Sequence, residues 1–239
     1  MRVTTGAIVL SSLKYGDTSM IVKAFTESDG LKTYLLKGIL GSKKGKLKAA
    51  YFQPLMQLEI VAIHRNKGTM ERLQEVKSTY PYQTVHTDVA KNAVAFFLSE
   101  MLGNSIHEEE RNEGLFRFLE AAFQWLDNHD QIANFHLYFL LELSKYFGFY
   151  PDITSGRSAY FDLQNGQFIP LPGIYPMLTG DELDHFIALL GINFDAIHTI
   201  RIGKEERQAL LQKIVLYFEL HLHGFRKPRS LAVLNEVFS

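Results

Sequence analysis

The side chains best suited to binding chemistry form a lysine-rich interval close to the N-terminus. No acidic residue occurs from Gly30 to Leu58, and three glycines interrupt the basic run. Lysine is a flexible point charge that binds phosphate groups without a fixed geometry. The interval therefore predicts contact with a nucleic-acid backbone, with a solvated surface loop as the alternative. Its lysines are Lys32, Lys37, Lys43, Lys44, Lys46 and Lys48.

Aromatic residues are interleaved with these lysines. Exposed rings could stack on the bases of a single strand, although a small barrel uses most of its aromatic side chains in the core. Tyr34 and Tyr51 are the preferred stacking candidates, because tyrosine tolerates a half-exposed position.

A second basic cluster near the C-terminus consists of Arg226, Lys227 and Arg229. It directly follows the end of a predicted helix, where the helix dipole favours cations. The cluster therefore has either this local electrostatic role or a second contact with DNA or a protein tail.

The same sequence offers little for catalysis. GILGSKKGK has some features of a phosphate-binding loop, but Leu47 stands where that motif needs a hydroxyl residue for magnesium. The chain has no cysteine, which excludes thiolate catalysis, disulfides and cysteine-based zinc sites. None of the nine histidines has the spacing of a familiar metal-ligand set. We therefore expect a binding protein that is not an enzyme and holds no metal ion or other cofactor.

The distribution of charge separates the first third of the chain from the remainder. Residues 1–80 contain 13 Lys and Arg against 6 Asp and Glu, a net charge of +7, whereas residues 81–239 carry −8. This asymmetry predicts that the first part binds a polyanion and that the second part has another role.

Residues 1–80 also have the pattern of a small β-barrel. Five runs rich in β-branched, aliphatic and aromatic residues are separated by turn signals such as Tyr15-Gly16-Asp17 and Ser28-Asp29-Gly30. Five short strands in about 80 residues favour an OB-fold, and an SH3-like barrel is the alternative.

The hydrophobic period becomes helical after residue 80, which predicts a helical domain over 81–239. One helix is expected after Thr87 or Asp88, with further helices near residues 115–125, 132–147 and 204–223. The apolar face of the first helix is predicted to contain Val89, Ala93, Phe96, Phe97 and Met101.

A β-hairpin is expected inside this helical domain, near 158–170. Asn165-Gly166 is a strong hairpin-turn signal between two short apolar runs. Thr179 and Glu182 have the spacing of a capping box at the start of another helix. The predicted fold class is thus α+β, with a five-stranded barrel at 1–80 and a helical domain with a hairpin insertion at 81–239.

The order of these segments resembles the RecO family of bacterial DNA-repair proteins. GAIVLSSLKYGDTSMIVKAFTESDG resembles the family's opening, and LLKGILGSKKGKLKAAYFQPLMQLEI resembles its basic loop and Gln-Pro segment. LLQKIVLYFELHLHGFRKPRSLAVL resembles its last helix and basic ending. The likeness extends over nearly the whole chain.

The resemblance implies a recombination mediator that binds single- and double-stranded DNA and anneals complementary strands. It also implies help in loading RecA onto DNA coated with single-strand-binding protein, with RecR and the acidic tail of that protein as partners. Lys145, beside Tyr146 and Phe149, is a candidate for contact with such a tail.

Many relatives carry a four-cysteine zinc site in the helical part, whereas the region from Asp152 to Gly173 has no cysteine here. Without a clear signal peptide or an apolar run long enough to span a membrane, we expect no membrane association and a cytoplasmic, nucleoid-associated protein. The alternative is an OB-fold module for RNA or a protein scaffold without annealing activity, because sequence patterns do not separate RNA from DNA.

Overall fold

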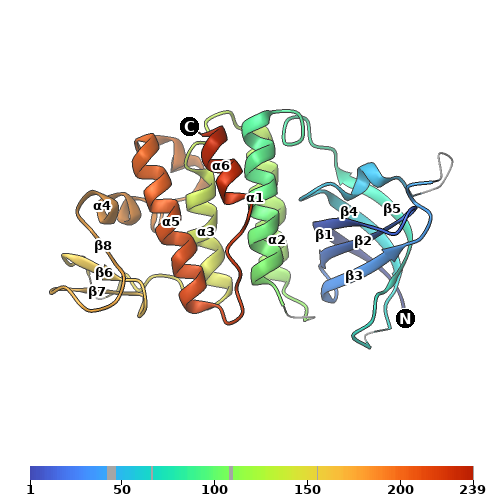
Figure 1. Cartoon of the computed structure of the whole chain (residues 1–239), viewed down its shortest axis with the longest axis horizontal. Helices are drawn as coiled ribbons and strands as arrows, with labels where there is room; N and C mark the ends of the chain where they lie inside the picture. Colours follow the sequence, from blue (N-terminus) through green and yellow to red (C-terminus); the bar gives the residue numbers. More distant parts are fainter. Residues whose placement is uncertain (42–46, 66, 108–109, 155, 239) are drawn as a thin grey trace. The chain divides into compact units, whose positions relative to one another are not determined.

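The computed structural model of the chain describes residues 1–41, 47–65, 67–107, 110–154 and 156–238. They form two compact units, each treated separately below. The first unit comprises Met1–Asn128 and Pro228–Leu231, and the second comprises His129–Lys227 and Ala232–Ser239. The first unit therefore holds the predicted barrel together with the first two helices (Figure 1).

The barrel is built from five antiparallel strands in the order β3-β2-β1-β4-β5. Their number and positions confirm the prediction for residues 1–80. The strands are β1 (Arg2–Tyr15), β2 (Ser19–Thr26), β3 (Gly30–Leu36), β4 (Gln57–Ile63) and β5 (Arg72–Tyr80).

The sheet is closed by contacts between its two outer strands. Glu71, just before β5, donates its backbone N–H to Thr33 at 2.7 Å and accepts from Leu35 at 3.4 Å. This pairing is parallel, unlike every other pairing in the sheet. A five-stranded barrel with this strand order and closure is an OB-fold.

Alternating residues of the strands fill the barrel interior. Val9, Val22, Tyr34 and Ile60 are buried there, and Phe52 of the short helix η1 (Ala49–Phe52) contributes to the same core. The alternation follows from the two-residue period of a strand, which sends successive side chains to opposite faces.

Two helices cover the outer face of β1: α1 (Val89–Ser105) and α2 (Glu113–Asn128). The ring of Phe116 on α2 lies so close to Gly6 that a Cβ atom there would come within 2.8 Å of it. Only glycine allows this approach without displacing the ring. The centroids of Phe116 and Phe25 are 6.2 Å apart, so β2 also packs against α2.

The start of α1 agrees with the prediction, and its buried face agrees in part, because Ala93, Phe97 and Met101 are buried. Asp88 is the N-cap, and its carboxylate accepts the backbone N–H of Lys91 at 2.9 Å. Phe97 is fully buried, whereas Val89 is 73% exposed and Phe96 is 50% exposed. Val89 in the first turn lies outside the buried face, and Phe96 lies at its edge, since adjacent residues on a helix differ by about 100°.

The second unit contains helices and a small sheet. The sheet has the order β7-β6-β8. The elements are α3 (Phe135–Tyr146), β6 (Tyr160–Asp162), β7 (Gln167–Ile169), β8 (Met177–Thr179), α4 (Gly180–Leu189), η2 (Phe194–Thr199), α5 (Lys204–His221) and most of α6 (Leu231–Val237).

The hairpin predicted at Asn165-Gly166 is present as β6 and β7. The carboxylate of Asp162 holds its turn, accepting the backbone N–H of Gln164 at 2.8 Å and of Asn165 at 3.2 Å. The hairpin turn is therefore held by hydrogen bonds, and the chain has no cysteine for a four-cysteine zinc site. These residues do not fit such a site.

The capping box predicted at the start of α4 is wrong, because its side-chain hydrogen bond does not form. The side chain of Thr179, the N-cap residue, forms no capping hydrogen bond. Glu206 instead accepts the backbone N–H of Gly203 at 2.9 Å, which caps the start of α5. The helix α6 was not predicted, because seven residues are too few for a clear helical period.

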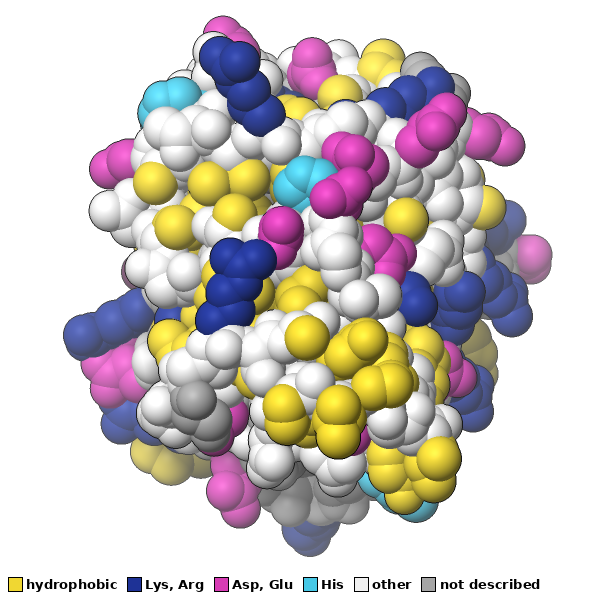
Figure 2. All heavy atoms as spheres, turned by 90° about the vertical axis from the view of Figure 1, so that its left-hand side faces the viewer, with side chains coloured by type: hydrophobic (Ala, Val, Ile, Leu, Met, Phe, Trp, Pro, Cys, Tyr) yellow, Lys and Arg dark blue, Asp and Glu magenta, His cyan; other side chains and the backbone are white. Residues whose placement is uncertain are grey.

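The second unit exposes apolar side chains next to its small sheet. Figure 2 looks onto this unit and shows hydrophobic side chains gathered on one part of its face. In the connection between β7 and β8, Leu171 is 75% exposed and Ile174 is 92% exposed. Apolar groups exposed in this way are typical of protein contact surfaces. None of the described helices is both long enough and apolar enough to cross a membrane.

Candidate nucleic-acid interface

The structure places the lysines of the acid-free interval in different environments. Lys37 follows β3 and Lys48 precedes η1, and both are exposed. They remain candidates for phosphate contact. Lys43, Lys44 and Lys46 lie outside the described residues.

Two of the predicted contact residues are buried, which contradicts a direct role in binding. Lys32 is 3% exposed and Tyr34 is 1% exposed, both on β3. The hydroxyl oxygen of Tyr34 lies 2.7 Å from Nε2 of His64, so the ring belongs to a polar network inside the barrel. We remove both residues from the interface, because neither presents its charge or ring face to solvent.

Tyr51 is partly buried in η1 and packs against the barrel core. The stacking of Tyr51 on a base remains a prediction. A clearer exposed ring is Tyr15 at the end of β1, which is 55% exposed.

The C-terminal basic cluster lies between α5 and α6, and all three side chains are exposed. Arg226 and Lys227 belong to the second unit, whereas Arg229 belongs to the first. The carboxylate of Glu100 on α1 fixes Arg229 there by accepting its backbone N–H at 2.9 Å. The structure therefore brings one member of the cluster to the unit that contains the barrel.

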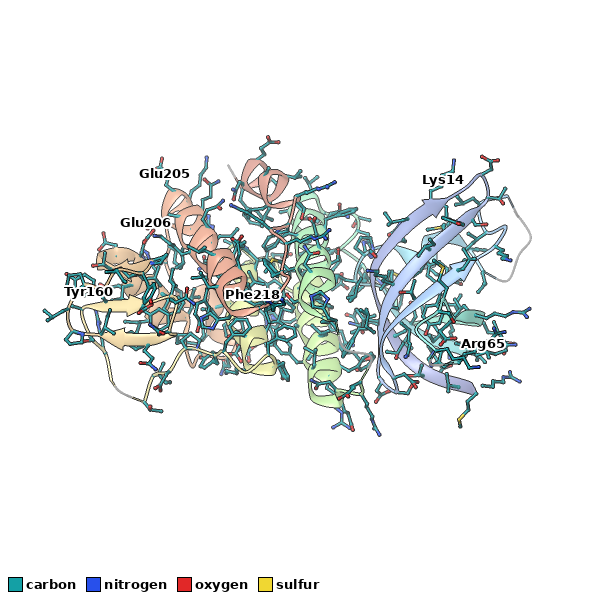
Figure 3. The ribbon with its side chains drawn as sticks, turned by 60° about the horizontal axis from the view of Figure 1, so that its bottom comes forward. Lys14, Arg65, Tyr160, Glu205, Glu206 and Phe218 are labelled. Atoms are coloured by element: carbon teal, nitrogen blue, oxygen red, sulfur yellow. The ribbon has the colours of Figure 1, made fainter. Side chains whose placement is uncertain are left out.

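Sequence reasoning did not single out several other exposed cations of the barrel. They surround the β1–β2 and β4–β5 loops or lie on β2, and two of them, Lys14 and Arg65, are labelled in Figure 3. Their position at strand ends, next to turn residues, was the sequence signal that could have identified them as exposed cations. These cations are Lys14, Lys23, Arg65, Lys67 and Arg72.

The β4–β5 loop is held in place from inside the barrel. Both carboxylate oxygens of Glu71 accept the backbone N–H of Arg65 at 2.9 Å. Nδ1 of His64 lies 2.9 Å from a carboxylate oxygen of Asp29. Since that carboxylate only accepts, Nδ1 donates to it and Nε2 is left to accept from the hydroxyl of Tyr34.

The protonation of this network is set by burial and charge. Burial, then the negative charges of Asp29 and Glu71, raise the pKa of the Tyr34 hydroxyl well above its ordinary range. Tyr34 therefore remains a neutral hydrogen-bond donor. Glu71 also holds the backbone at Arg65, which lowers the entropic cost of placing this cation against a phosphate chain.

The chemistry available on this surface is binding. OB-folds bind oligonucleotides with the face of strands 2 and 3 and with the loops between strands 1 and 2 and between strands 4 and 5. The exposed cations occupy this region in the present chain. Across the described residues, His, Cys, Asp and Glu form no group of three that could hold a metal ion.

Comparison with known proteins agrees with this architecture. Residues 1–82 match the sequence model described as Recombination protein O N terminal, and residues 86–231 match Recombination protein O C terminal. The chain belongs to the RecO family.

Full-length relatives support the assignment. A DNA repair protein RecO of Flavobacterium psychrophilum is 52% identical over 239 residues, and the alignment covers 100% of both chains. The protein of the same name from Christiangramia forsetii is 50% identical over 238 residues, again with complete coverage of both. A more distant RecO, from Phocaeicola vulgatus, is 36% identical with 98% of each chain covered.

Proposed function

We propose that this chain is a DNA-repair and recombination mediator that binds single- and double-stranded DNA, anneals complementary strands and acts without catalysis. The observation that carries the proposal is an OB-fold of net charge +7 whose exposed cations surround its ligand-binding loops. Membership of the RecO family adds the expectation of a role in repair. We also propose a cytoplasmic, nucleoid-associated location.

Annealing follows from this chemistry in physical terms. Two complementary strands repel each other through their phosphates, and a basic surface that binds both reduces this repulsion. Lysine side chains suit the task because they bind phosphates without fixing the path of the backbone. Bases that are not tightly held remain available for pairing.

Protein partners complete the proposal: RecR, and single-strand-binding protein through its acidic tail, so that RecA can be loaded onto coated DNA. The apolar side chains Leu171 and Ile174 support a protein contact on the second unit. The site first predicted on α3 is less suitable. Lys145 is paired with Glu142 at 2.7 Å, and Phe149 is buried against Phe218 with ring centroids 5.0 Å apart.

The test is annealing of complementary strands precoated with their cognate single-strand-binding protein, using the full-length chain. A Lys14→Glu, Arg65→Glu double variant, changed at the β1–β2 and β4–β5 loops, should anneal more slowly and bind single strands more weakly. Its salt slope should fall by about 0.7 for each phosphate group that the variant no longer neutralises. The matched control is Arg201→Glu, Lys204→Glu, which makes the same charge change at two exposed positions in the second unit.

Equal reductions in both variants would mean that net charge alone, and not the barrel surface, determines binding. Competition between RNA and DNA oligomers of the same sequence tests the nucleic acid involved. Stronger binding of RNA, with no annealing of coated DNA, would overturn the proposal in favour of an RNA-binding module.

A further inference from the structure

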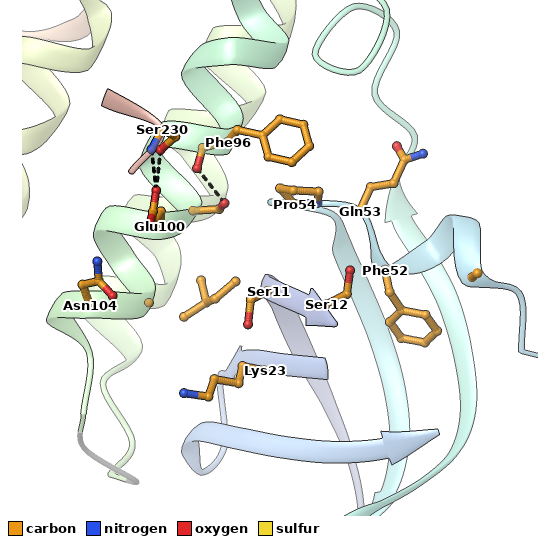
Figure 4. A pocket seen from close by; sticks show the side chains of 14 residues that line it. Ser11, Ser12, Lys23, Phe52, Gln53, Pro54, Phe96, Glu100, Asn104 and Ser230 are labelled. Carbon is orange, nitrogen blue, oxygen red and sulfur yellow. Dashed lines mark hydrogen bonds between the residues drawn. The ribbon is translucent and has the colours of Figure 1, made fainter. Parts of the chain in front are cut away.

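The first unit contains a cavity of about 530 Å³ between the barrel and α1 (Figure 4). We name it the Phe96 pocket. Its walls come from β1, β2, the η1 region, α1 and Ser230. The volume lies within the range of about 300–1,000 Å³ that is typical of small-molecule sites.

An exposed aromatic ring lies at this pocket. Phe96 is 50% exposed, and within the described part of the chain its ring contacts no other aromatic ring. Pro54 lies on the same side of the pocket, so the two side chains border it with flat apolar faces (Figure 4). Such faces suit the π-face of a nucleobase, which stacks on aromatic side chains whatever its sequence.

Polar side chains line other parts of the same cavity. Ser11 and Ser12 on β1 contribute hydroxyls, and Gln53 and Asn104 contribute amides. Hydroxyl and amide groups both donate and accept hydrogen bonds. They therefore match the edge of a nucleobase, which also carries donors and acceptors.

One cation lines the cavity, and two more immediately precede lining residues in the chain. Lys23 on β2 lines the cavity, is exposed and forms neither a hydrogen bond nor an ion pair with any described residue. Lys48 immediately precedes the lining residue Ala49, and Arg229 immediately precedes Ser230. The structure thus brings the ends of both basic segments to one cavity.

Glu100 fixes the C-terminal segment at the wall. Its carboxylate accepts the backbone N–H of Arg229 at 2.9 Å. It also accepts the backbone N–H of Ser230 at 2.9 Å and the Ser230 hydroxyl at 2.6 Å (Figure 4). Burial raises the pKa of Glu100, but these hydrogen bonds outweigh it and hold the pKa below its ordinary value. The ionised carboxylate therefore holds Arg229 and Ser230 at the wall of the cavity.

We propose that the Phe96 pocket receives one unpaired nucleobase of a single DNA strand, with Lys23, Lys48 and Arg229 binding the flanking phosphates. The inference rests on the proposed DNA-binding function and names a base subsite within it. A paired base is held in the duplex stack, so the pocket contributes to single-strand binding and not to duplex binding.

The first test is Phe96→Ala in the full-length chain, with single-strand and duplex affinities measured by fluorescence anisotropy. One base–aromatic contact contributes a factor of about 5 to 150 to affinity. Because Phe96 is half exposed, we expect single-strand affinity to fall about 10-fold and duplex affinity to change less than about 2-fold. The matched control, Val89→Ala, removes an exposed apolar side chain from the same helix and should change neither.

A second variant fills the pocket with a larger side chain, whereas Phe96→Ala removes a lining side chain. Gly103 on α1 lines the cavity, and a Cβ atom added there would have no heavy atom within 4 Å. Gly103→Leu should therefore fold at least as well, since glycine is a poor helix former. It should reduce single-strand affinity by a similar factor and leave duplex affinity unchanged.

An oligonucleotide of abasic sites separates base binding from phosphate binding. The wild-type chain should bind it more weakly than a normal strand, and this difference should be smaller for Phe96→Ala. Single-strand affinity that is unchanged in both variants would overturn the pocket while leaving the proposed function intact. Failure of the wild-type chain to bind either form of DNA would overturn both.

A synthetic acidic peptide with a C-terminal phenylalanine tests the competing occupant. The pocket proposal expects Phe96→Ala and Gly103→Leu to leave its affinity unchanged. If both variants failed to bind the peptide and retained single-strand affinity, the cavity would be a protein-binding site and the proposal would be wrong.

Discussion

The connection between β5 and α1 depends on one buried carboxylate, Asp127 at the end of α2. Its Oδ1 accepts the backbone N–H of Thr84 at 2.8 Å and the backbone N–H of Val85 at 3.1 Å. The backbone N–H of Gln83 donates to both carboxylate oxygens. The hydroxyl of Thr84 donates to the same Oδ1 at 3.0 Å. Lys91, itself buried, donates to the backbone oxygen of Asp127 at 2.9 Å. We predict that Asp127→Asn destabilises the first unit.

The expected magnitude follows from the number and kind of bonds. Hydrogen bonds to a charged group are worth about 1.5–3 kcal/mol each, compared with about 1 kcal/mol for neutral pairs. Asparagine retains one accepting oxygen, so the substitution weakens about three charge-assisted bonds and leaves one donor poorly matched. The bonds share one carboxylate and are not additive. We expect a loss of about 2–3 kcal/mol, which lowers Tm by about 4–12 °C for a chain of this size.

The pH dependence has a definite sign. Burial alone raises the pKa of Asp127, but the hydrogen bonds from residues 83–85 outweigh it, and the net pKa is lowered. A lowered folded-state pKa contributes stability above the unfolded value of about 3.9, and this stability is lost as the pH falls through the folded value. The difference in the free energy of unfolding between wild type and Asp127→Asn should therefore be largest at pH 7 and should shrink below about pH 4.

Thermal and urea denaturation, each followed by circular dichroism at pH 7 and pH 3.5, measure both effects. Asp17→Asn is the control, because Asp17 is an exposed carboxylate in the same unit. A Tm for Asp127→Asn within 1 °C of wild type at pH 7, or a deficit that grows at low pH, would refute the reasoning.

Three further predictions concern the buried polar groups and metal dependence. Tyr34→Phe removes a buried hydroxyl bonded to His64 and should cost about 1–3 kcal/mol in urea denaturation, without changing DNA affinity. Burial, then the charge of Arg207, lowers the pKa of His136 to about 3. The second unit should therefore lose stability as the pH falls from about 6.5 toward 3, and His136→Phe should reduce this loss in thermal melts. Chelator should leave Tm unchanged and elemental analysis should find no stoichiometric zinc, because the chain has no cysteine.

The elements with local signals were the ones predicted from the sequence. The five strands, the Asn165-Gly166 turn and the Asp88 cap all depend on residues that are neighbours in the chain. The closing contact of the barrel was also consistent with strand number, since five strands favour an OB-fold. These features need only the strand period, turn chemistry and capping preferences.

The errors came from partners that are distant in the sequence. Tyr34 was expected at the surface because tyrosine tolerates partial exposure, but His64, 30 residues later, supplies a buried partner for its hydroxyl. Phe96 was expected in the core because its spacing from Ala93 fits an apolar face. Its exposure depends on how α1 turns against β1, which no helical period specifies.

The two interpretations of the C-terminal basic cluster differ in what they require of Arg229. The dipole of a helix acts within its last turn, and α5 ends at His221. Arg229 lies eight residues beyond that end, and Glu100 holds its backbone on another helix. The dipole therefore does not account for Arg229. We propose that its charge instead binds a phosphate, because a strand whose base occupies the Phe96 pocket must carry its phosphates past the wall to which the backbone of Arg229 is fixed.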